Sequence, residues 1–168
     1  MTPFRFGVQL SSAPSGAAWR ELARRVEGLG YSTLFIPDHF EDQLGPLVAL
    51  TVAAEATTTL RVGSLVFGND YRHPVVLAKE VATLDLLSEG RVEFGLGAGW
   101  MTTDYEQSGM VHDPAGVRIG RMAESLAVMK SLWATGACTF EGEHYRITGA
   151  IGAPRPHAQP HPPIIIGG

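Results

Sequence analysis

The sequence has one cysteine, little charge and no long apolar run. The single Cys138 cannot form an internal disulfide, and such sparse use of cysteine is typical of a reducing cytoplasm. No stretch of about 18 apolar residues is present, so no membrane span is expected. Residues 1–4 lead at once into a strand-like pattern, without the basic segment and apolar region of a signal peptide. We therefore expect a cytoplasmic protein.

The sequence also has few positively charged residues. Lysine and arginine total 13 against 17 aspartate and glutamate residues, which gives a net charge of -4. This balance provides no electrostatic attraction for nucleic acid or for an anionic membrane, so neither is an expected partner. Apolar residues make up 45% of the 168 residues, which is enough for the packed core of one domain.

What the sequence contains is a repeated unit of strand and helix. Strand-like patterns cover residues 4–10, 33–36, 60–67 and 91–96. Ser15 is a good cap for a helix that glycines close at residues 28 and 30, and prolines open two more helices, at residues 46–56 and from residue 74 to about 88. The strands recur at roughly 30-residue intervals, the length of a βαβ unit, so the pattern predicts a parallel sheet with right-handed crossovers.

Beyond residue 100 the pattern changes. Residues 101–112 have no clear period and indicate a long loop at the carboxyl end of the sheet. Asp113 and Pro114 resemble a cap and first turn, followed by an amphipathic helix to residue 134. A small hairpin with Gly142 in its turn is expected near residues 137–147, and residues 164–166 form a fifth buried strand after a proline-rich connector.

Two folds fit this pattern. Five parallel strands in a chain of this length suit a doubly wound, flavodoxin-like sheet. A closed eight-stranded barrel typically needs roughly 250 residues. Composition and periodicity do not decide between the two.

The candidate chemical centre follows the second strand. Pro37 ends this strand because proline cannot donate to the ladder, and Asp38 and His39 come next. Ligands and catalytic groups gather at the carboxyl ends of parallel strands. An imidazole suits proton transfer near neutral pH, and the carboxylate beside it can accept a hydrogen bond from a cofactor or orient the ring. The structural alternative is that Asp38 caps a turn and His39 packs in a loop.

A glycine-rich segment follows the fourth strand. Residues 95–99 match half of the dinucleotide fingerprint G-x-G-x-x-G, but Trp100 occupies the place of the last glycine, so a Rossmann site is not favoured. We interpret the glycines as positions where the backbone approaches a flat ring. Trp100 either walls a substrate pocket or belongs to the core.

A metal site is a weaker hypothesis. Asp38, His39, His73 and His112 are the candidate ligands for a metal hydrolase, but the chain has no ligand set spaced as H-x-H or H-E-x-x-H. His73 directly precedes Pro74 and is more typical of a helix start than of a ligand. We expect no metal.

Several stretches together resemble the N-terminal part of the bacterial-luciferase-like superfamily, in particular its deazaflavin (coenzyme F420)-dependent oxidoreductases. The matching stretches are residues 30–39 (GYSTLFIPDH), 60–66 (LRVGSLV), 71–79 (YRHPVVLAK), 83–100 (TLDLLSEGRVEFGLGAGW) and 140–145 (FEGEHY). The resemblance implies an α/β fold of the (β/α)8 TIM-barrel type, here a single domain over residues 1–168 that is truncated after the fifth strand. Such a partial barrel leaves open edges, so we expect it to associate with a second copy, as a homodimer or larger homo-oligomer, or with the part that completes the barrel.

The resemblance also assigns residues to a cofactor site. It implies that His39 and Asp38 lie beside the cofactor ring as catalytic residues, with Asp38 also in contact with the cofactor. It implies that a strand bulge with a non-prolyl cis peptide supports the ring at Ser64, Leu65 and Val66. The other cofactor-binding positions that it implies are Gly97, Ala98, Gly99 and Trp100, with Gly167 and Gly168 as a phosphate-contacting turn. Some deazaflavin-dependent sugar-phosphate dehydrogenases carry an acid where this chain has Trp100, which argues against that proton donor and that substrate.

Three functions remain in competition at this point. The first is hydride transfer between F420 and a small organic molecule. The second is an FMN-dependent monooxygenase, in which His39 assists oxygen activation. The third is a non-catalytic half-barrel that needs a partner to complete the fold.

Overall fold

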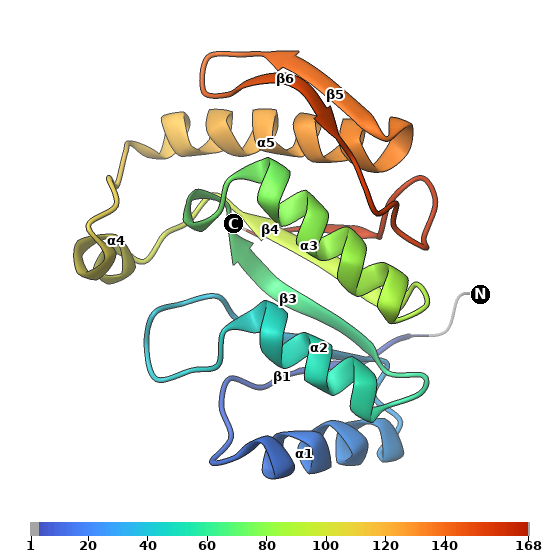
Figure 1. Ribbon diagram of the computed structural model, residues 1–168. Coiled ribbons are helices and arrows are strands. Elements are labelled where there is room, and N and C mark those ends of the chain that lie inside the picture. The colour runs from blue at the N-terminus through green and yellow to red at the C-terminus, as the bar shows by residue number, and fades with distance from the viewer. Residues whose placement is uncertain (1–3, 168) are drawn as a thin grey trace.

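The computed structural model describes residues 4–167 as one parallel sheet with helices and a separate hairpin (Figure 1). The sheet contains β1 (Gly7–Gln9), β2 (Thr33–Ile36), β3 (Arg61–Gly68), β4 (Val92–Gly97) and β7 (Ile164–Gly167). The helices are α1 (Gly16–Gly28), α2 (Pro46–Ala56), α3 (Pro74–Leu87), α4 (Thr102–Ser108) and α5 (Ala115–Thr135), with a 3-10 turn at Asn69–Tyr71. The hairpin pairs β5 (Ala137–Glu141) with β6 (Arg146–Ile151).

The order of the strands decides between the two folds. Neighbouring strands run β1-β2-β3-β4-β7, in the order of the chain, and every pair is parallel. Helices α1, α2, α3 and α5 lie along one face of the sheet, and the hairpin covers α5 (Figure 1). A doubly wound sheet reverses its strand order and carries helices on both faces. The chain therefore folds as a section of a (β/α) barrel wall, and the TIM-barrel prediction is confirmed.

The predicted starts of helices α1, α2 and α3 are confirmed, and each is determined by residues close to it in the sequence. The Ser15 hydroxyl accepts a hydrogen bond from the Ala18 N–H at 3.1 Å and caps α1. Pro46 and Pro74 occupy the first turns of α2 and α3, and the His73 ring caps α3 by accepting from the Val75 N–H. His73 is thus a helix-start residue, as its position before proline indicated.

Two segments differ from the sequence prediction. Residues 102–108 form helix α4 rather than loop, because Asp104 and Tyr105 are buried by tertiary contacts that a periodicity analysis does not include. Pro114, rather than Asp113, is the N-cap of α5, and Asp113 pairs with Arg121 instead. Both differences arise from tertiary or side-chain contacts that neither the apolar periodicity nor the residue type at the helix start reveals.

The hairpin has Gly142 in its turn, as the sequence indicated. Gly142 has no left-handed φ; a Cβ atom at this position would collide with the carboxylate of Glu124 on α5. That carboxylate accepts hydrogen bonds from the N–H groups of Glu143, His144 and Tyr145 at 2.8–3.1 Å. Gly142 is therefore needed for the close approach of the turn to α5, and the strands extend past the expected end, to Ile151.

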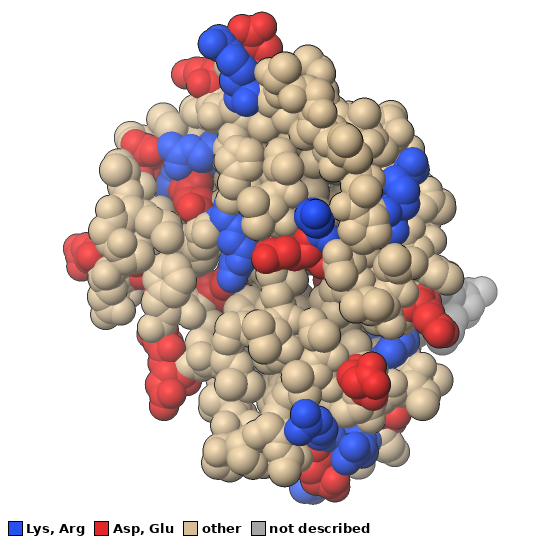
Figure 2. All heavy atoms as spheres, viewed as in Figure 1, with Lys and Arg blue, Asp and Glu red and all other residues tan. Residues whose placement is uncertain are grey.

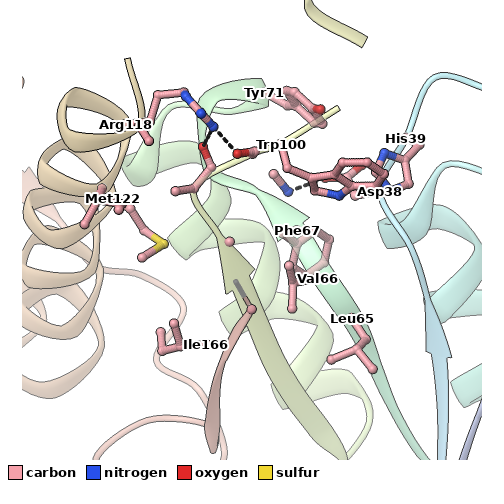
Figure 3. Close-up of a pocket in the computed structure, with 17 residues that line it drawn as sticks. Asp38, His39, Leu65, Val66, Phe67, Tyr71, Trp100, Arg118, Met122 and Ile166 are labelled. Atoms are coloured by element: carbon pink, nitrogen blue, oxygen red, sulfur yellow. Dashed lines mark hydrogen bonds between the residues drawn. The ribbon is translucent and has the colours of Figure 1, made fainter. Parts of the chain in front are cut away.

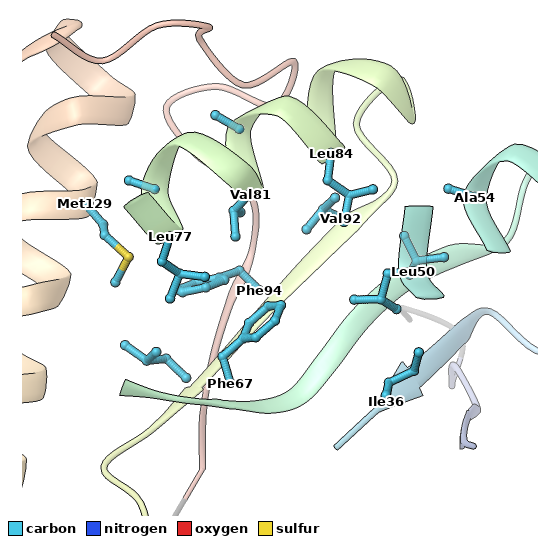
Figure 4. Close-up of a cluster of buried hydrophobic side chains, with 14 of the residues drawn as sticks. Ile36, Leu50, Ala54, Phe67, Leu77, Val81, Leu84, Val92, Phe94 and Met129 are labelled. Atoms are coloured by element: carbon cyan, nitrogen blue, oxygen red, sulfur yellow. The ribbon is translucent and has the colours of Figure 1, made fainter. Parts of the chain in front are cut away.

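The core lies between the sheet and its helices. Leu77, Val81 and Leu84 point from α3 toward Val92 and Phe94 on the sheet (Figure 4). Two buried tryptophans also tie helices together. The Trp19 indole donates to the Ala49 carbonyl and the Trp133 indole donates to the Ala78 carbonyl, each at 2.8 Å, so α1 is joined to α2 and α5 to α3.

The opposite face of the sheet is less covered. Leu65 on β3 and Ile166 on β7 are 40% and 56% exposed. The prediction of a buried strand at residues 164–166 was therefore wrong: among the described residues β7 is an edge strand of the sheet, and it is only partly buried. On the helical face, charged side chains stand in small groups separated by uncharged surface (Figure 2). Among the described helices none is long and apolar enough to cross a membrane. Association with a second copy stays a prediction.

Glu27 at the end of α1 provides a test of stability against pH. Its Oε1 accepts the N–H groups of Thr58, Thr59 and Leu60 at 2.7–2.9 Å. Burial acts to raise the pKa of the Glu27 carboxyl, but these backbone hydrogen bonds outweigh it and lower the pKa to about 2. The folded state thus favours the ionised form, and the stabilisation is complete above the ordinary pKa of 4.5 and is lost as the pH falls toward 2.

We expect Glu27→Gln to lower the free energy of unfolding by about 1–2 kcal/mol at pH 7, because a neutral amide accepts these hydrogen bonds more weakly. The difference from the unsubstituted protein should shrink below pH 4.5. Urea unfolding at several pH values measures it. Glu21→Gln, on the exposed face of the same helix, is the matched control. A difference that does not change with pH would contradict this account.

Candidate active site

A cavity of about 600 Å³ opens at the carboxyl ends of β2, β3, β4 and β7 (Figure 3). It is lined by Asp38, His39, Leu65, Val66, Phe67, Gly68, Tyr71, Gly97, Ala98, Gly99, Trp100, Ala115, Arg118, Ile119, Met122, Ile166 and Gly167. Most of these side chains are apolar, with a small number of polar groups at one side. This composition and volume are typical of a small-molecule or cofactor site.

His39 is held at the rim of the cavity by a buried carboxylate. Its Nδ1 lies 2.7 Å from Oδ2 of Asp104, at the start of α4. The Tyr71 hydroxyl donates to the same oxygen at 2.8 Å, and the Phe40 N–H donates to Oδ1 at 3.1 Å. On its other side the imidazole meets the edge of Trp100, with ring centroids 5.8 Å apart.

The hydrogen bonds on Asp104 determine its charge. Burial acts to raise the pKa of this carboxyl, but the hydrogen bonds from His39, from the Phe40 N–H and from Tyr71 outweigh burial and hold the pKa below its usual range. Burial, together with the bond to ionised Asp104, raises the pKa of Tyr71. At neutral pH the cluster therefore contains a carboxylate anion, a protonated phenol and an imidazole.

Asp38 has a different partner. Both of its carboxylate oxygens bind the Arg72 guanidinium, and Oδ2 also accepts the Gly68 N–H at 3.0 Å. Asp38 thus joins the end of β2 to the end of β3. It lines the cavity, but the residue that orients the His39 ring is Asp104.

One apolar wall of the cavity is formed by a bulge in β3. The Leu65–Val66 peptide is cis, and the pairing of β3 with β4 shifts register between Ser64 and Phe67, as the resemblance implied. Val66 packs closely on two neighbouring glycines, since a Cβ atom at Gly97 or Gly167 would lie within 2.6 or 2.7 Å of its Cγ2. These glycines let an apolar surface form across three strands.

Arg118 and Tyr105 fix the segment after β4. Arg118 reaches from α5 and donates to the carbonyls of Ala98 and Gly99, while its Nε donates to the Asp113 carbonyl at 2.8 Å. The Tyr105 hydroxyl donates to Asp70 at 3.0 Å, and burial together with this carboxylate raises the pKa of Tyr105 to about 12. Gly99 adopts φ 83°, a conformation in which a side chain would be strained, and a Cβ atom there would collide with the Tyr105 hydroxyl.

Most of the predicted site residues meet at this cavity. Those that line it are Asp38, His39, Leu65, Val66, Gly97, Ala98, Gly99, Trp100 and Gly167. Ser64 does not: it is fully buried and its hydroxyl donates to the Ile36 carbonyl at 2.8 Å. Gly168 lies outside the described residues.

The sequence analysis missed residues on both sides of the cavity. Asp104 and Tyr71 were not singled out, because their link to His39 spans more than 30 positions in the sequence. Arg118 and Met122 lie on the expected amphipathic helix, and no signal marked them as cavity residues. The segment 101–112 was expected at the carboxyl end of the sheet, so its two acidic residues, Asp104 and Glu106, were the available clue.

The side chains considered as metal ligands in the sequence analysis have other contacts in the structure. His73 caps α3, and the ring of His112 lies 4.5 Å from that of Tyr105. Within residues 4–167 no three His, Cys, Asp or Glu side chains are grouped as a metal ion requires.

A comparison of the whole chain with models of known protein families gives a match over its full length, including the residues of this cavity. The luciferase-like monooxygenase family model matches residues 1–168. The chain belongs to this family. The family has F420-dependent and flavin-dependent relatives, which agrees with the resemblance found in the sequence.

Three relatives illustrate the range. The F420-dependent glucose-6-phosphate dehydrogenase of Amycolatopsis mediterranei is 32% identical over 88% of this chain. The F420-dependent tetrahydromethanopterin reductase of Methanopyrus kandleri superposes with a TM-score of 0.88 at 23% identity over 98% of the chain. The 3,6-diketocamphane monooxygenase of Pseudomonas putida, in complex with FMN, superposes with a TM-score of 0.78 at 18% identity over 96% of the chain.

The chain spans about half the length of these relatives. It covers 46% of the dehydrogenase, 50% of the reductase and 51% of the monooxygenase. The two solved structures establish that the fold is shared.

Proposed function

We propose that the protein is an oxidoreductase that transfers a hydride between coenzyme F420 and a small organic substrate. The observation that carries this proposal is the cavity itself, in which an imidazole held by a buried carboxylate faces an apolar wall at the carboxyl ends of parallel strands. F420, when bound, supplies a ring that carries two electrons as a hydride. The proton that accompanies the hydride must be handled by the protein.

The residues present fit a flat cofactor ring. Leu65, Val66 and Ile166 form an apolar surface, and the side-chain-free backbone of Gly97 and Gly99 continues it. The glycine positions are required by the geometry, because a Cβ atom at Gly97 would collide with Val66 and displace the wall. A tricyclic ring placed on this surface would bury apolar area against Leu65, Val66 and Ile166.

His39 is the residue that moves the proton. When a substrate hydroxyl is oxidised, its carbon loses a hydride and its oxygen loses a proton, and Nε2 of His39 takes that proton. In the reverse direction the imidazolium returns it to the carbonyl oxygen. Among residues 4–167 Nε2 has no hydrogen-bond partner, so this atom is free to contact a ligand.

The contacts of Trp100, Arg72 and Arg118 indicate which class of substrate the cavity can accept. Trp100 is 70% exposed at the cavity and lies against His39, where it can contact substrate. Arg72 is paired with Asp38, and Arg118 donates to three backbone carbonyls. The cavity lining is mostly apolar and Asp38 occupies the Arg72 guanidinium, so an uncharged substrate is favoured over a sugar phosphate.

Titration of the purified protein with F420 and with FMN tests the proposal. We expect saturable F420 binding and hydride transfer to or from uncharged alcohols or carbonyl compounds, followed by absorbance of the deazaflavin. Tight FMN binding without F420 binding would support the monooxygenase instead. Binding of neither cofactor by the folded protein would support a non-catalytic half-barrel.

A further inference from the structure

We propose that Asp104 is a positioning residue for His39: its carboxylate keeps the ring proton on Nδ1 and leaves Nε2 as the basic atom that faces the cavity. This inference rests on the proposed function, in which His39 moves the substrate proton.

The hydrogen bonds around Asp104 fix the direction of the bond to His39. An ionised carboxylate only accepts hydrogen bonds. Three groups surround it: the Phe40 N–H on Oδ1, and the Tyr71 hydroxyl and His39 Nδ1 on Oδ2. Among residues 4–167 no lysine or arginine pairs with this carboxylate, and His39 is its one basic neighbour. Nδ1 must therefore donate.

The neutral imidazole carries one N–H, so a proton fixed on Nδ1 leaves the lone pair on Nε2. This is the tautomer that can accept a proton from a substrate oxygen. Asp104 takes no proton in the reaction. Its buried negative charge stabilises the imidazolium that forms, and the proton returns from Nε2 to the substrate oxygen in the reverse direction.

Tyr71 holds the carboxylate in place from the other side. Its ring packs against Phe40, with centroids 4.7 Å apart, and its hydroxyl shares Oδ2 with His39. Tyr71 and Phe40 thus restrict the rotation of Asp104, while Trp100 packs against the imidazole itself. The ring is positioned by contacts from three separate segments of the chain.

The tautomer of His39 is the direct test and does not depend on activity. Nitrogen-15 NMR of histidine-labelled protein, with His39 assigned by the spectrum of His39→Gln, reports which ring nitrogen carries the proton. We expect the Nδ1–H form at a pH where the ring is neutral. An Nε2–H form would overturn the proposal, even if F420 turnover is observed. An Nδ1–H form without F420 turnover would support the positioning role and leave the proposed function as the part that failed.

Asp104→Asn is the informative substitution. The amide oxygen is expected to stay on the Phe40 N–H, so the amide NH2 faces Nδ1, which must then accept, and the proton moves to Nε2. We expect kcat to fall roughly 100-fold, with KM and cofactor affinity changed less than about threefold. Unchanged kcat with an unchanged tautomer would overturn the proposal.

Two further variants complete the test. Asp42→Asn removes one negative charge from an exposed position three residues after His39 and should change neither tautomer nor kcat. Tyr71→Phe removes only the hydroxyl, and the Nδ1–H form should persist. If Tyr71→Phe moves the proton to Nε2, Asp104 is not the group that sets the tautomer. This variant and the unsubstituted protein decide the matter even if Asp104→Asn does not fold.

Discussion

Replacing His39 with alanine is expected to lower turnover about 1,000-fold, equivalent to about 4 kcal/mol of transition-state stabilisation. The substitution removes the atom that exchanges a proton with the substrate. It leaves the apolar wall of Leu65, Val66 and Ile166 intact, so cofactor affinity should change less than about threefold. Steady-state kinetics with F420, together with equilibrium titration of the cofactor, separate the two effects.

His157→Ala is the matched control for this experiment. His157 is exposed and does not line the cavity, so turnover and cofactor affinity should both be preserved. An equal loss of turnover and affinity in His39→Ala would show that the imidazole binds the cofactor rather than moving a proton. Full activity of His39→Ala would refute its assignment as the base.

Phe94→Ala is expected to destabilise the fold by about 3–5 kcal/mol. The Phe94 side chain is fully buried on the helical face of β4 (Figure 4), with its centroid 5.8 Å from that of Phe67 and 5.2 Å from that of Trp133. Truncation removes contacts with β3 and with α5 and leaves a cavity that rigid neighbours cannot fill. Thermal unfolding should show a midpoint lowered by roughly 10 °C.

Leu87→Ala provides the comparison on the same side of the sheet. Leu87 ends α3 and is 69% exposed, so its truncation should change the free energy of unfolding by less than about 0.5 kcal/mol. Phe94 lies outside the cavity, so folded Phe94→Ala protein should retain cofactor affinity. A loss of stability below about 1 kcal/mol would mean that the core repacks around the site.

The elements of the fold could be predicted because short-range chemistry determines them. Ser15 caps α1, Pro46 and Pro74 open α2 and α3, and the residues before Pro37 form β2. Each of these boundaries depends on groups a few positions apart, which a sequence displays directly. The helix at residues 102–108 was missed because no local period marks it; buried Tyr105 and Asp104 stabilise it through distant partners.

The candidate site was likewise predicted only in part: several of its residues could be found from the sequence, but their partners could not. Asp38 and His39 were found because they follow a strand end, and the barrel fold places them at the cavity rim with Leu65, Val66 and Trp100. Their separate roles could not be predicted from their being neighbours in the sequence. The pairing of His39 with Asp104 joins residues 65 positions apart, and the pairing of Asp38 with Arg72 joins residues 34 apart.

Local sequence patterns therefore determine which segments become strands and helices, and that an acid and an imidazole follow the second strand. Strand order, the helices on a single face and the partner of each ionisable side chain are decided only when the sheet assembles. The physical reason is range: capping and periodicity act within a few residues, whereas hydrogen bonds and packing select partners by distance in space.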